Sequence, residues 1–125
     1  MTTTYAQQVI VDGPKTAVVK VHLTSTGGVD ADTIDVSALE GSPSTVKIMQ
    51  IWTFTDGCDV HLAWDATTDV EILPLAVDEN DHVDFRCFGG LLNNAGTGVT
   101  GDIIITPHNT SNGDTAAVIL ELSKS

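Results

Sequence analysis

Three aspartates close together in the sequence are the first residues that suggest a chemical site. Asp30, Asp32 and Asp35 lie within the stretch VDADTIDVS, and a hard cation such as calcium prefers several carboxylate oxygens on one loop. The ligand order of an EF-hand loop, with its central glycine and its distal glutamate, is absent. We therefore interpret these aspartates as a solvated acidic loop, and we predict that the protein needs no metal and no other cofactor.

The histidines and cysteines are spaced too widely to predict a metal centre or an activated nucleophile. The histidines fall on four separate expected strands or strand ends: His22, His61, His82 and His108. Cys58 and Cys87 lack the spacing of metal ligands, and we predict that both are free thiols. The sequence contains no G-x-S-x-G motif, no Walker loop and no dinucleotide fingerprint. No catalytic residue is therefore assigned, and we predict that the protein is not an enzyme.

Both tryptophans fall in residues 45–65, which are expected to form a two-stranded hairpin. Asp56-Gly57 tolerates the positive φ angles of a tight turn, and β-branched and aromatic residues flank it on both sides. Alternate residues share one face of a strand. The expected apolar face contains Val46, Ile48, Trp52, Phe54, Val60, Leu62 and Trp64. We predict that Trp52 and Trp64 are core residues rather than a platform for stacking sugars.

Other short runs with the character of strands predict that the rest of the chain is also made of strands. These runs are residues 7–12, 15–25, 30–37, 70–77, 82–87, 102–107 and 115–123. Pro74 predicts a sheet edge or the end of a strand, because proline lacks the backbone donor of an interior strand. With the hairpin we expect about eight strands and no helix, in an all-β antiparallel sandwich of jelly-roll type. Another Greek-key sandwich is the alternative.

The length and the charge of the chain limit its organisation and its partners. The chain has 125 residues, which predicts a single domain at 7–125 preceded by an N-terminal arm at 1–6. Its 17 acidic and 5 basic residues give a net charge of −12. This charge disfavours direct contact with nucleic acid or with an anionic membrane. We find no secretory signal and no membrane span in the sequence, so we expect synthesis in a reducing cytoplasm.

Several stretches, taken together, resemble a family of small virion structural proteins of tailed bacteriophages. They span nearly the whole chain in order: QQVIVDGPKTAVVKV, STVKIMQIW, HLAWDATTDV, FGGLLNNAGTGVTGDIII and GDTAAVILEL. The resemblance implies a β-sandwich subunit made in an infected bacterium. Its implied function is that of a capsid decoration or cement protein on the major capsid protein lattice. The localisation that follows is the capsid surface of the virion, with synthesis in the host cytoplasm.

The alternatives are another virion component, such as a head-to-tail connector or a tail or fibre subunit, and a carbohydrate-binding module. We expect the decoration protein to be a homo-oligomer, a dimer or a trimer, because a multimer on a repeating lattice gains avidity. The N-terminal arm and the glycine-rich residues 89–101 have no evident role inside the domain. The residues predicted to contact the partner come from these two segments: Thr2, Thr3, Thr4, Tyr5, Leu91, Leu92, Asn93 and Asn94.

Overall fold

The computed structural model describes residues 4–26, 31–41, 43, 45–57, 59–75, 80–93, 96, 101–108 and 112–124. These residues form nine strands and two short 3-10 helices, and they contain no α-helix. The strands are β1 (Thr4–Asp12), β2 (Thr16–Thr26), β3 (Asp32–Ile34), β4 (Val46–Asp56), β5 (Asp59–Trp64), β6 (Val70–Leu75), β7 (Asn80–Asp84), β8 (Ile103–His108) and β9 (Asn112–Lys124). The 3-10 helices are η1 (Val36–Ala38) and η2 (Arg86–Phe88).

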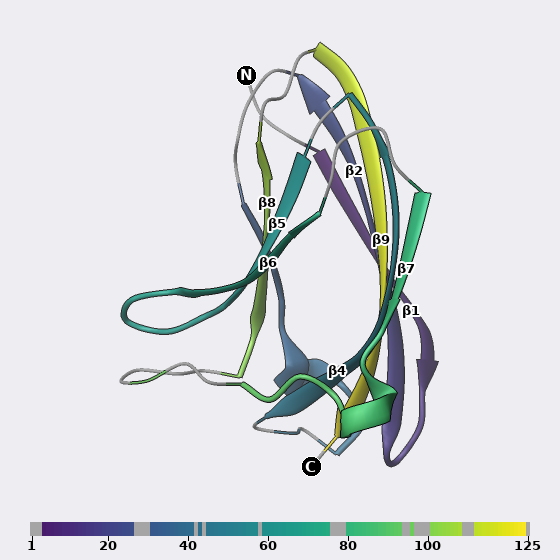
Figure 1. Ribbon diagram of the computed structural model, residues 1–125, viewed down its shortest axis with the longest axis vertical. Coiled ribbons are helices and arrows are strands. Elements are labelled where there is room, and N and C mark those ends of the chain that lie inside the picture. The colour runs from purple at the N-terminus through teal and green to yellow at the C-terminus, as the bar shows by residue number, and fades with distance from the viewer. Residues whose placement is uncertain are drawn as a thin grey trace.

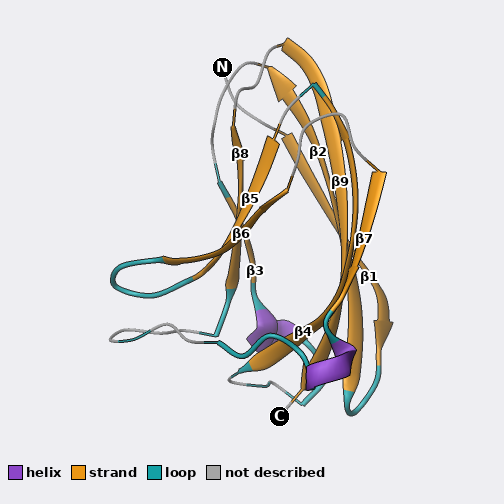
Figure 2. Cartoon of the chain, in the orientation of Figure 1, coloured by secondary structure: helices purple, strands orange, loops and turns teal. Residues whose placement is uncertain are grey.

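The strands form two antiparallel sheets that face each other across the core (Figures 1 and 2). One sheet has the order β1-β2-β9-β4-β7, and the other has the order β3-β8-β5-β6. From β2 onward every connection except β5 to β6 leads from one sheet to the other, which is the winding of a jelly roll. The predicted antiparallel jelly-roll sandwich is therefore confirmed: β2 to β9 are its eight strands, and β1 is a ninth at an edge.

Alternating aliphatic residues on the two long central strands form the middle of the core. The inward residues of β2 and β9 are each at most 2% exposed: Ala17, Val19, Val21, Leu23, Ala116, Val118, Leu120 and Leu122. The two strands are paired with each other, with Val19 opposite Leu120 and Val21 opposite Val118. Ile103 and Ile105 of β8 close the core from the second sheet. The alternation seen in the sequence thus predicted these core residues correctly.

The predicted hairpin at residues 45–65 is wrong, because its two strands belong to different sheets. β4 pairs with β9 and β7, whereas β5 pairs with β8 and β6. A turn does follow Asp56, and Gly57 has a φ of +90°, which favours glycine. The chain at that turn crosses the core instead of folding back within one sheet. Alternating burial is the same for a hairpin and for a crossing, so the pattern could not separate them.

Trp64 is buried as predicted, but the prediction for Trp52 is wrong. Trp64 is 1% exposed, whereas Trp52 is half-buried and Phe54 is 45% exposed. The cause is a bulge in β4: Ile48 pairs with Leu122 and Gln50 with Glu121, so one extra residue lies between them. A single extra residue exchanges the two faces of a strand. Beyond the bulge Ile51, not Trp52, points into the core.

The N-terminal arm is shorter than predicted, because β1 begins at Thr4 instead of Gln7. Thr4 pairs with Thr24 and Tyr5 with Leu23 on the neighbouring β2. The Tyr5 side chain packs against the core and its hydroxyl donates to the Ile105 carbonyl oxygen at 3.5 Å. These contacts place residues 4–6 in the five-stranded sheet.

Two expected strands are shorter than predicted, because each gives way to a 3-10 helix. β3 ends at Ile34, and Asp35 then caps η1 by accepting the Ser37 backbone N–H at 3.0 Å. β7 ends at Asp84, whose carboxylate accepts the Arg86 backbone N–H at 2.9 Å where η2 begins. The prediction that Pro74 lies at a sheet edge or near the end of a strand is confirmed, since β6 lies at one end of the four-stranded sheet and ends at Leu75.

Candidate functional site

The residues predicted to contact a partner divide into two groups at opposite edges of the five-stranded sheet. Thr4 and Tyr5 begin the edge strand β1, and Thr4 is exposed. Leu91 lies beyond β4 on the side away from β9, where its backbone exchanges two hydrogen bonds with Ile48. The structure therefore does not bring the two groups together into one surface. Thr2, Thr3 and Asn94 lie outside the described residues.

The three described residues of the second group have different surroundings. Leu91 is half-buried and packs against the core, and Asn93 is also half-buried. Leu92 is 66% exposed. Gly90 begins this segment with a φ of +97°, and a Cβ there would lie 2.6 Å from the Met49 sulfur. Only Leu92 of this group presents a large apolar side chain to solvent.

An exposed apolar surface that the site prediction omitted lies along β1. Every described side chain of β1 is exposed except the half-buried Tyr5. Val9, Ile10 and Val11 are consecutive aliphatic residues that are 49%, 49% and 47% exposed. We call these three residues the β1 aliphatic patch. The signal in the sequence was this run itself, because three consecutive aliphatics cannot all point to the buried face of one strand.

The β1 edge has few of the features that keep edge strands from pairing with other chains. β1 ends the strand order of its sheet, and it has no charged residue between Thr4 and Val11. Its bulge lies between Val9 and Val11, so the strand is regular from Thr4 to Val9. Exposed edges are usually protected by charge, proline, bulges or short length. This edge is long and uncharged, and among the described strands β2 alone pairs with it, so its outer side is a place where a strand of another chain can add.

A nearly buried lysine holds the C-terminal end of β1 in place. The Lys124 side chain is 5% exposed, and its ammonium donates to Asp12 Oδ1 at 2.6 Å and to the carbonyl oxygens of Gly13 and Glu40. The Asp12 carboxylate also accepts the Glu40 backbone N–H at 2.9 Å. The Lys124 ammonium, and then the Glu40 N–H, lower the pKa of Asp12. The edge strand is therefore fixed to the body of the sandwich rather than loosely attached.

The opposite edge of the same sheet is charged. The Arg86 guanidinium donates to both oxygens of Asp84, from Nε at 3.0 Å and from Nη2 at 2.8 Å. This bidentate pair lowers the pKa of Asp84 to about 2.

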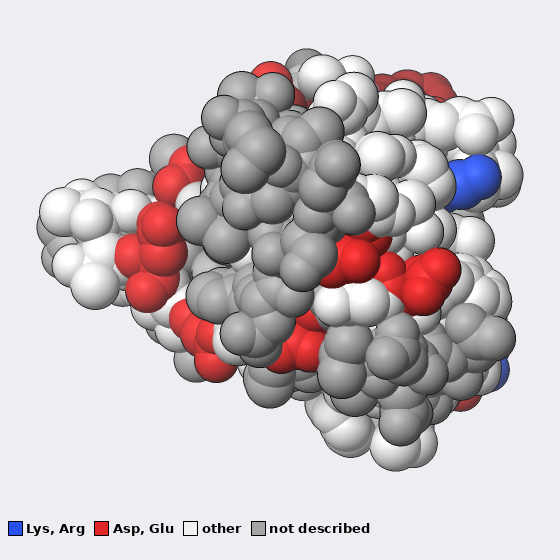
Figure 3. Space-filling model, turned by 90° about the horizontal axis from the view of Figure 1, so that it is seen from above, with Lys and Arg blue, Asp and Glu red and all other residues white. Residues whose placement is uncertain are grey.

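Viewed from above, the described surface shows many acidic groups and few basic ones (Figure 3). An anionic partner would meet repulsion at these acidic groups.

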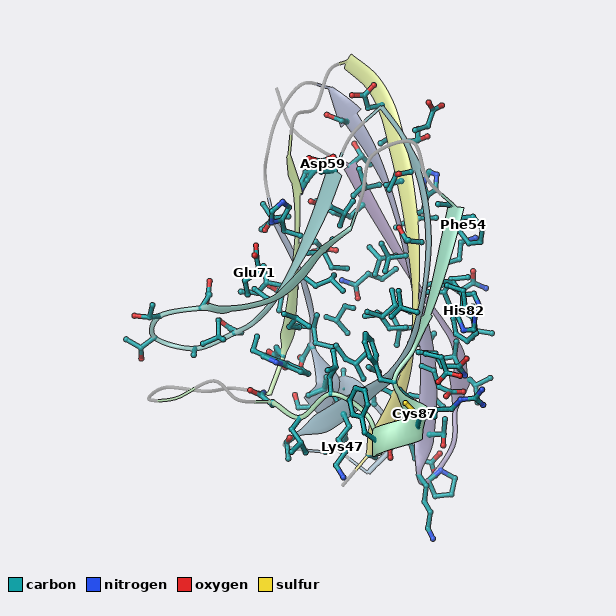
Figure 4. All side chains as sticks on the ribbon, viewed as in Figure 1. Lys47, Phe54, Asp59, Glu71, His82 and Cys87 are labelled. Atoms are coloured by element: carbon teal, nitrogen blue, oxygen red, sulfur yellow. The ribbon has the colours of Figure 1, made fainter. Side chains whose placement is uncertain are left out.

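The outer face of the five-stranded sheet carries an aromatic stack. Trp52 and His82 are cross-strand neighbours with ring centroids 4.9 Å apart and planes within 4° of parallel. Gln50 donates to Glu121 Oε1 at 3.1 Å and accepts from His82 Nε2 at 2.8 Å. The amide orientation set by Glu121 thus places a proton on His82 Nε2. His82 and Phe54 point away from the core (Figure 4).

The other residues considered for catalysis or metal binding have structural contacts of their own. Among the described residues no group of three or more His, Cys, Asp or Glu side chains could hold a metal ion. Asp32 accepts from the Gln7 side chain at 2.8 Å, and His61 pairs with Glu71. Cys87 is an exposed free thiol on η2. Asp30, Cys58 and the side chain of His108 lie outside what the structure describes.

Comparisons with known proteins give no family for this chain. No family model and no curated protein matches it. Among solved structures, a cupin superfamily protein from Desulfitobacterium hafniense DCB-2 matches with a TM-score of 0.34 and 6% identity. The match covers 97% of this chain and 77% of that one, and at this score it carries no functional argument. Within the described residues no helix is long and apolar enough to cross a membrane.

Proposed function

We propose that this protein is a capsid decoration protein of a tailed bacteriophage, which binds the outer surface of the major capsid protein lattice and stabilises the head. In this proposal the chain has a structural function without catalysis, and it is located on the virion surface. The observation that carries the proposal is the β1 edge. It combines a strand edge that no further described strand pairs with and the aliphatic patch of Val9, Ile10 and Val11, each about half exposed.

The chemistry of β1 favours a protein partner over the other partner classes. An open strand edge offers backbone donors and acceptors that another strand can pair with, and apolar side chains beside it add burial. The absence of charge from Thr4 to Val11 lets a partner approach this one segment of a chain with a net charge of −12. Contacts made there should depend little on salt, because screening acts on charged groups.

The sandwich also holds β1 rigidly, as binding of a neighbour to this edge requires. Lys124 fixes the end of β1, and Tyr5 fixes its beginning through the core and the Ile105 carbonyl. A strand that is already ordered loses little conformational entropy on binding. We further propose that the protein is a dimer or a trimer on the lattice, so that weak contacts of each copy add through avidity.

The experiment that tests this proposal adds purified protein to capsids that lack it, and measures co-sedimentation and particle stability. Bound protein should appear at many positions over the shell in a low-resolution map, and the decorated heads should resist heating better. Density at a single vertex, or along a tail, would assign the chain to a connector or a tail component instead. Failure to bind any virion part would contradict the proposal.

A variant that lacks residues 1–5 tests the predicted N-terminal contact residues separately. Removing Tyr5 also removes its contact with the core, so a Tyr5→Phe variant of the full chain is the matched control for the hydroxyl contact. A Tyr5→Ala variant of the full chain is the control for the lost core contact. If Thr2 to Thr4 contact the lattice, the truncated protein should bind more weakly while Tyr5→Phe and Tyr5→Ala bind normally. Equal binding by the truncated chain would exclude this segment and leave the β1 aliphatic patch as the contact.

A further inference from the structure

A slot lies on the outer face of the five-stranded sheet between two rings. The strand register places His22 of β2 beside Ala117 of β9, and Ala117 beside Phe54 of β4. His22 and Phe54 are exposed, and Ala117 between them is half-buried. The small alanine side chain leaves the space between the two rings open. His22, Ala117 and Phe54, with the neighbouring Thr115 and Asp56, line a cavity of about 270 Å³.

In the adjacent row of the same sheet, a larger side chain fills the space that corresponds to the slot. One row further along the strands, Lys20 lies beside Ile119, and Ile119 beside Trp52, which stacks on His82. There the central position holds a branched aliphatic side chain instead of a methyl group. The slot therefore exists because residue 117 is alanine, and a larger residue at that position would close it.

The spacing of the strands fits one ring between the two walls. Neighbouring strands are about 4.8 Å apart, so side chains on β2 and β4, with β9 between them, stand about 9.6 Å apart. Two successive ring stacks with centroid separations of about 4.5 to 5 Å each need about 9 to 10 Å. The cavity volume of about 270 Å³ is slightly below the range of about 300 to 1,000 Å³ for drug-sized ligands, which suits a single ring.

Oxygen-bearing side chains line one side of the slot. The next row of the register contains Thr24, Thr115 and Asp56 in adjacent positions on β2, β9 and β4. A ligand in the slot would therefore have apolar contacts on its two faces and on the Ala117 floor, and hydrogen-bonding groups along one edge. The Asp56 carboxylate and the net charge of −12 disfavour phosphates and other anions.

We propose that this slot binds one pyranose ring of a neutral oligosaccharide. A pyranose has apolar C–H faces that pack on the rings of His22 and Phe54, and hydroxyl groups at its edge that can donate to Asp56. A free nucleotide has the ring but carries the phosphate that the slot disfavours. The proposal concerns the outer sheet face and is independent of β1, so the protein can bind a lattice and a sugar at the same time.

The test uses ligand-observed saturation-transfer NMR on the full chain with glucose, galactose, mannose, N-acetylglucosamine, lactose, cellobiose and chitobiose. At least one of these sugars should receive saturation from the protein, with a dissociation constant of about 1 mM. Phe54→Ala removes one wall, and Ala117→Ile copies the filled row at Ile119. Each should weaken binding by at least about tenfold. Both positions face outward, so the melting temperature reports whether the variants remain folded.

Phe88→Ala is the matched control, because Phe88 is 63% exposed and lies on η2 away from the slot. It should leave sugar binding unchanged. Saturation of none of the seven sugars would overturn the proposal, and so would binding that survives both slot variants. N-acetyl-tyrosinamide serves as a competing probe. If it binds while no sugar does, the slot accepts an aromatic side chain of another protein, and the sugar assignment is wrong.

Discussion

The two edges of the five-stranded sheet differ in the properties that control whether a strand pairs with another chain. β1 is nine residues long, has no charge from Thr4 to Val11 and exposes three aliphatic side chains. β7 is five residues long and ends at Asp84, which is ion-paired with Arg86. Natural sheets protect their edges with short strands and charge. β7 is protected in this way and β1 is not, so of these two edges we propose β1 as the one that meets a partner.

A loss of partner binding is informative only if the sandwich itself stays folded, so the comparison needs a core variant as reference. Trp64 is 1% exposed, and Trp64→Ala should lower the free energy of unfolding by about 3 to 5 kcal/mol. Trp52 is half-buried, so Trp52→Ala should cost less than half as much. Urea denaturation followed by circular dichroism measures both. Equal costs would contradict the reversal of faces at the β4 bulge.

The anchoring of β1 can be broken without touching its exposed residues. Lys124→Met keeps the apolar stem but removes the hydrogen bonds to Asp12, Gly13 and Glu40. Losing a charged donor to two carbonyl oxygens should cost about 1 to 3 kcal/mol. Hydrogen exchange should rise mainly in β1 and in the following turn. Uniformly faster exchange across all strands would show that Lys124 supports the whole fold rather than this edge.

Changing the exposed residues of β1 should have a smaller effect on stability than either variant above. Val9→Thr, Ile10→Thr and Val11→Thr together keep residues suited to strands but remove apolar surface. Because each side chain is about half exposed, we expect a total cost below about 1 kcal/mol. Denaturation midpoints test this directly. A larger loss would mean that the β1 aliphatic patch serves the fold, and the argument for a contact surface would fail.

The smallest expected effect concerns the protected edge and depends on pH. The pKa of Asp84 is lowered from its ordinary value of 3.8 to about 2 by Arg86. Because the folded state holds this proton more weakly, the pair stabilises the protein above pH 4, and this contribution is lost as the pH falls towards 2. Asp84→Asn should therefore reduce the melting temperature slightly at pH 6 and converge with the original protein near pH 2. A gap that is constant with pH would exclude the ion pair as its cause.

The sequence predicts features that depend on neighbouring residues along the chain, but not those that depend on how distant segments pair. Alternation on β2 and β9 identified core residues such as Val19 and Leu120 correctly, because burial repeats every second residue along a strand. The bulge near Met49 was not predictable from the same pattern, since it depends on how β4 pairs with β9. The sequence contained one sign of the bulge: Ile51 is three positions after Ile48, so the two cannot share one face of a regular strand. The assignment of β4 and β5 to different sheets likewise depends on contacts distant in sequence.

The candidate contact residues show the same limit. Thr4 and Leu92 are both exposed, but their positions at opposite edges of one sheet follow from the strand order, which depends on contacts distant in sequence. The run Val9 to Val11 was visible in the sequence, and only the position of β1 beyond β2 shows that the run is not buried. The slot at Ala117 also depends on register, because His22 and Phe54 are far apart in the chain.

The proposal that β1 meets the capsid lattice is tested most directly by comparing the two edges in one capsid-binding assay. One variant carries Val9→Thr, Ile10→Thr and Val11→Thr. Its control carries Phe88→Thr, which removes the side chain of an exposed aromatic residue beside the protected edge. We predict that the β1 variant binds undecorated capsids at least about tenfold more weakly, while the control binds like the original protein at low and high salt. Full binding by the β1 variant, or equal losses in both, would contradict the central claim that β1 is the edge that meets the lattice.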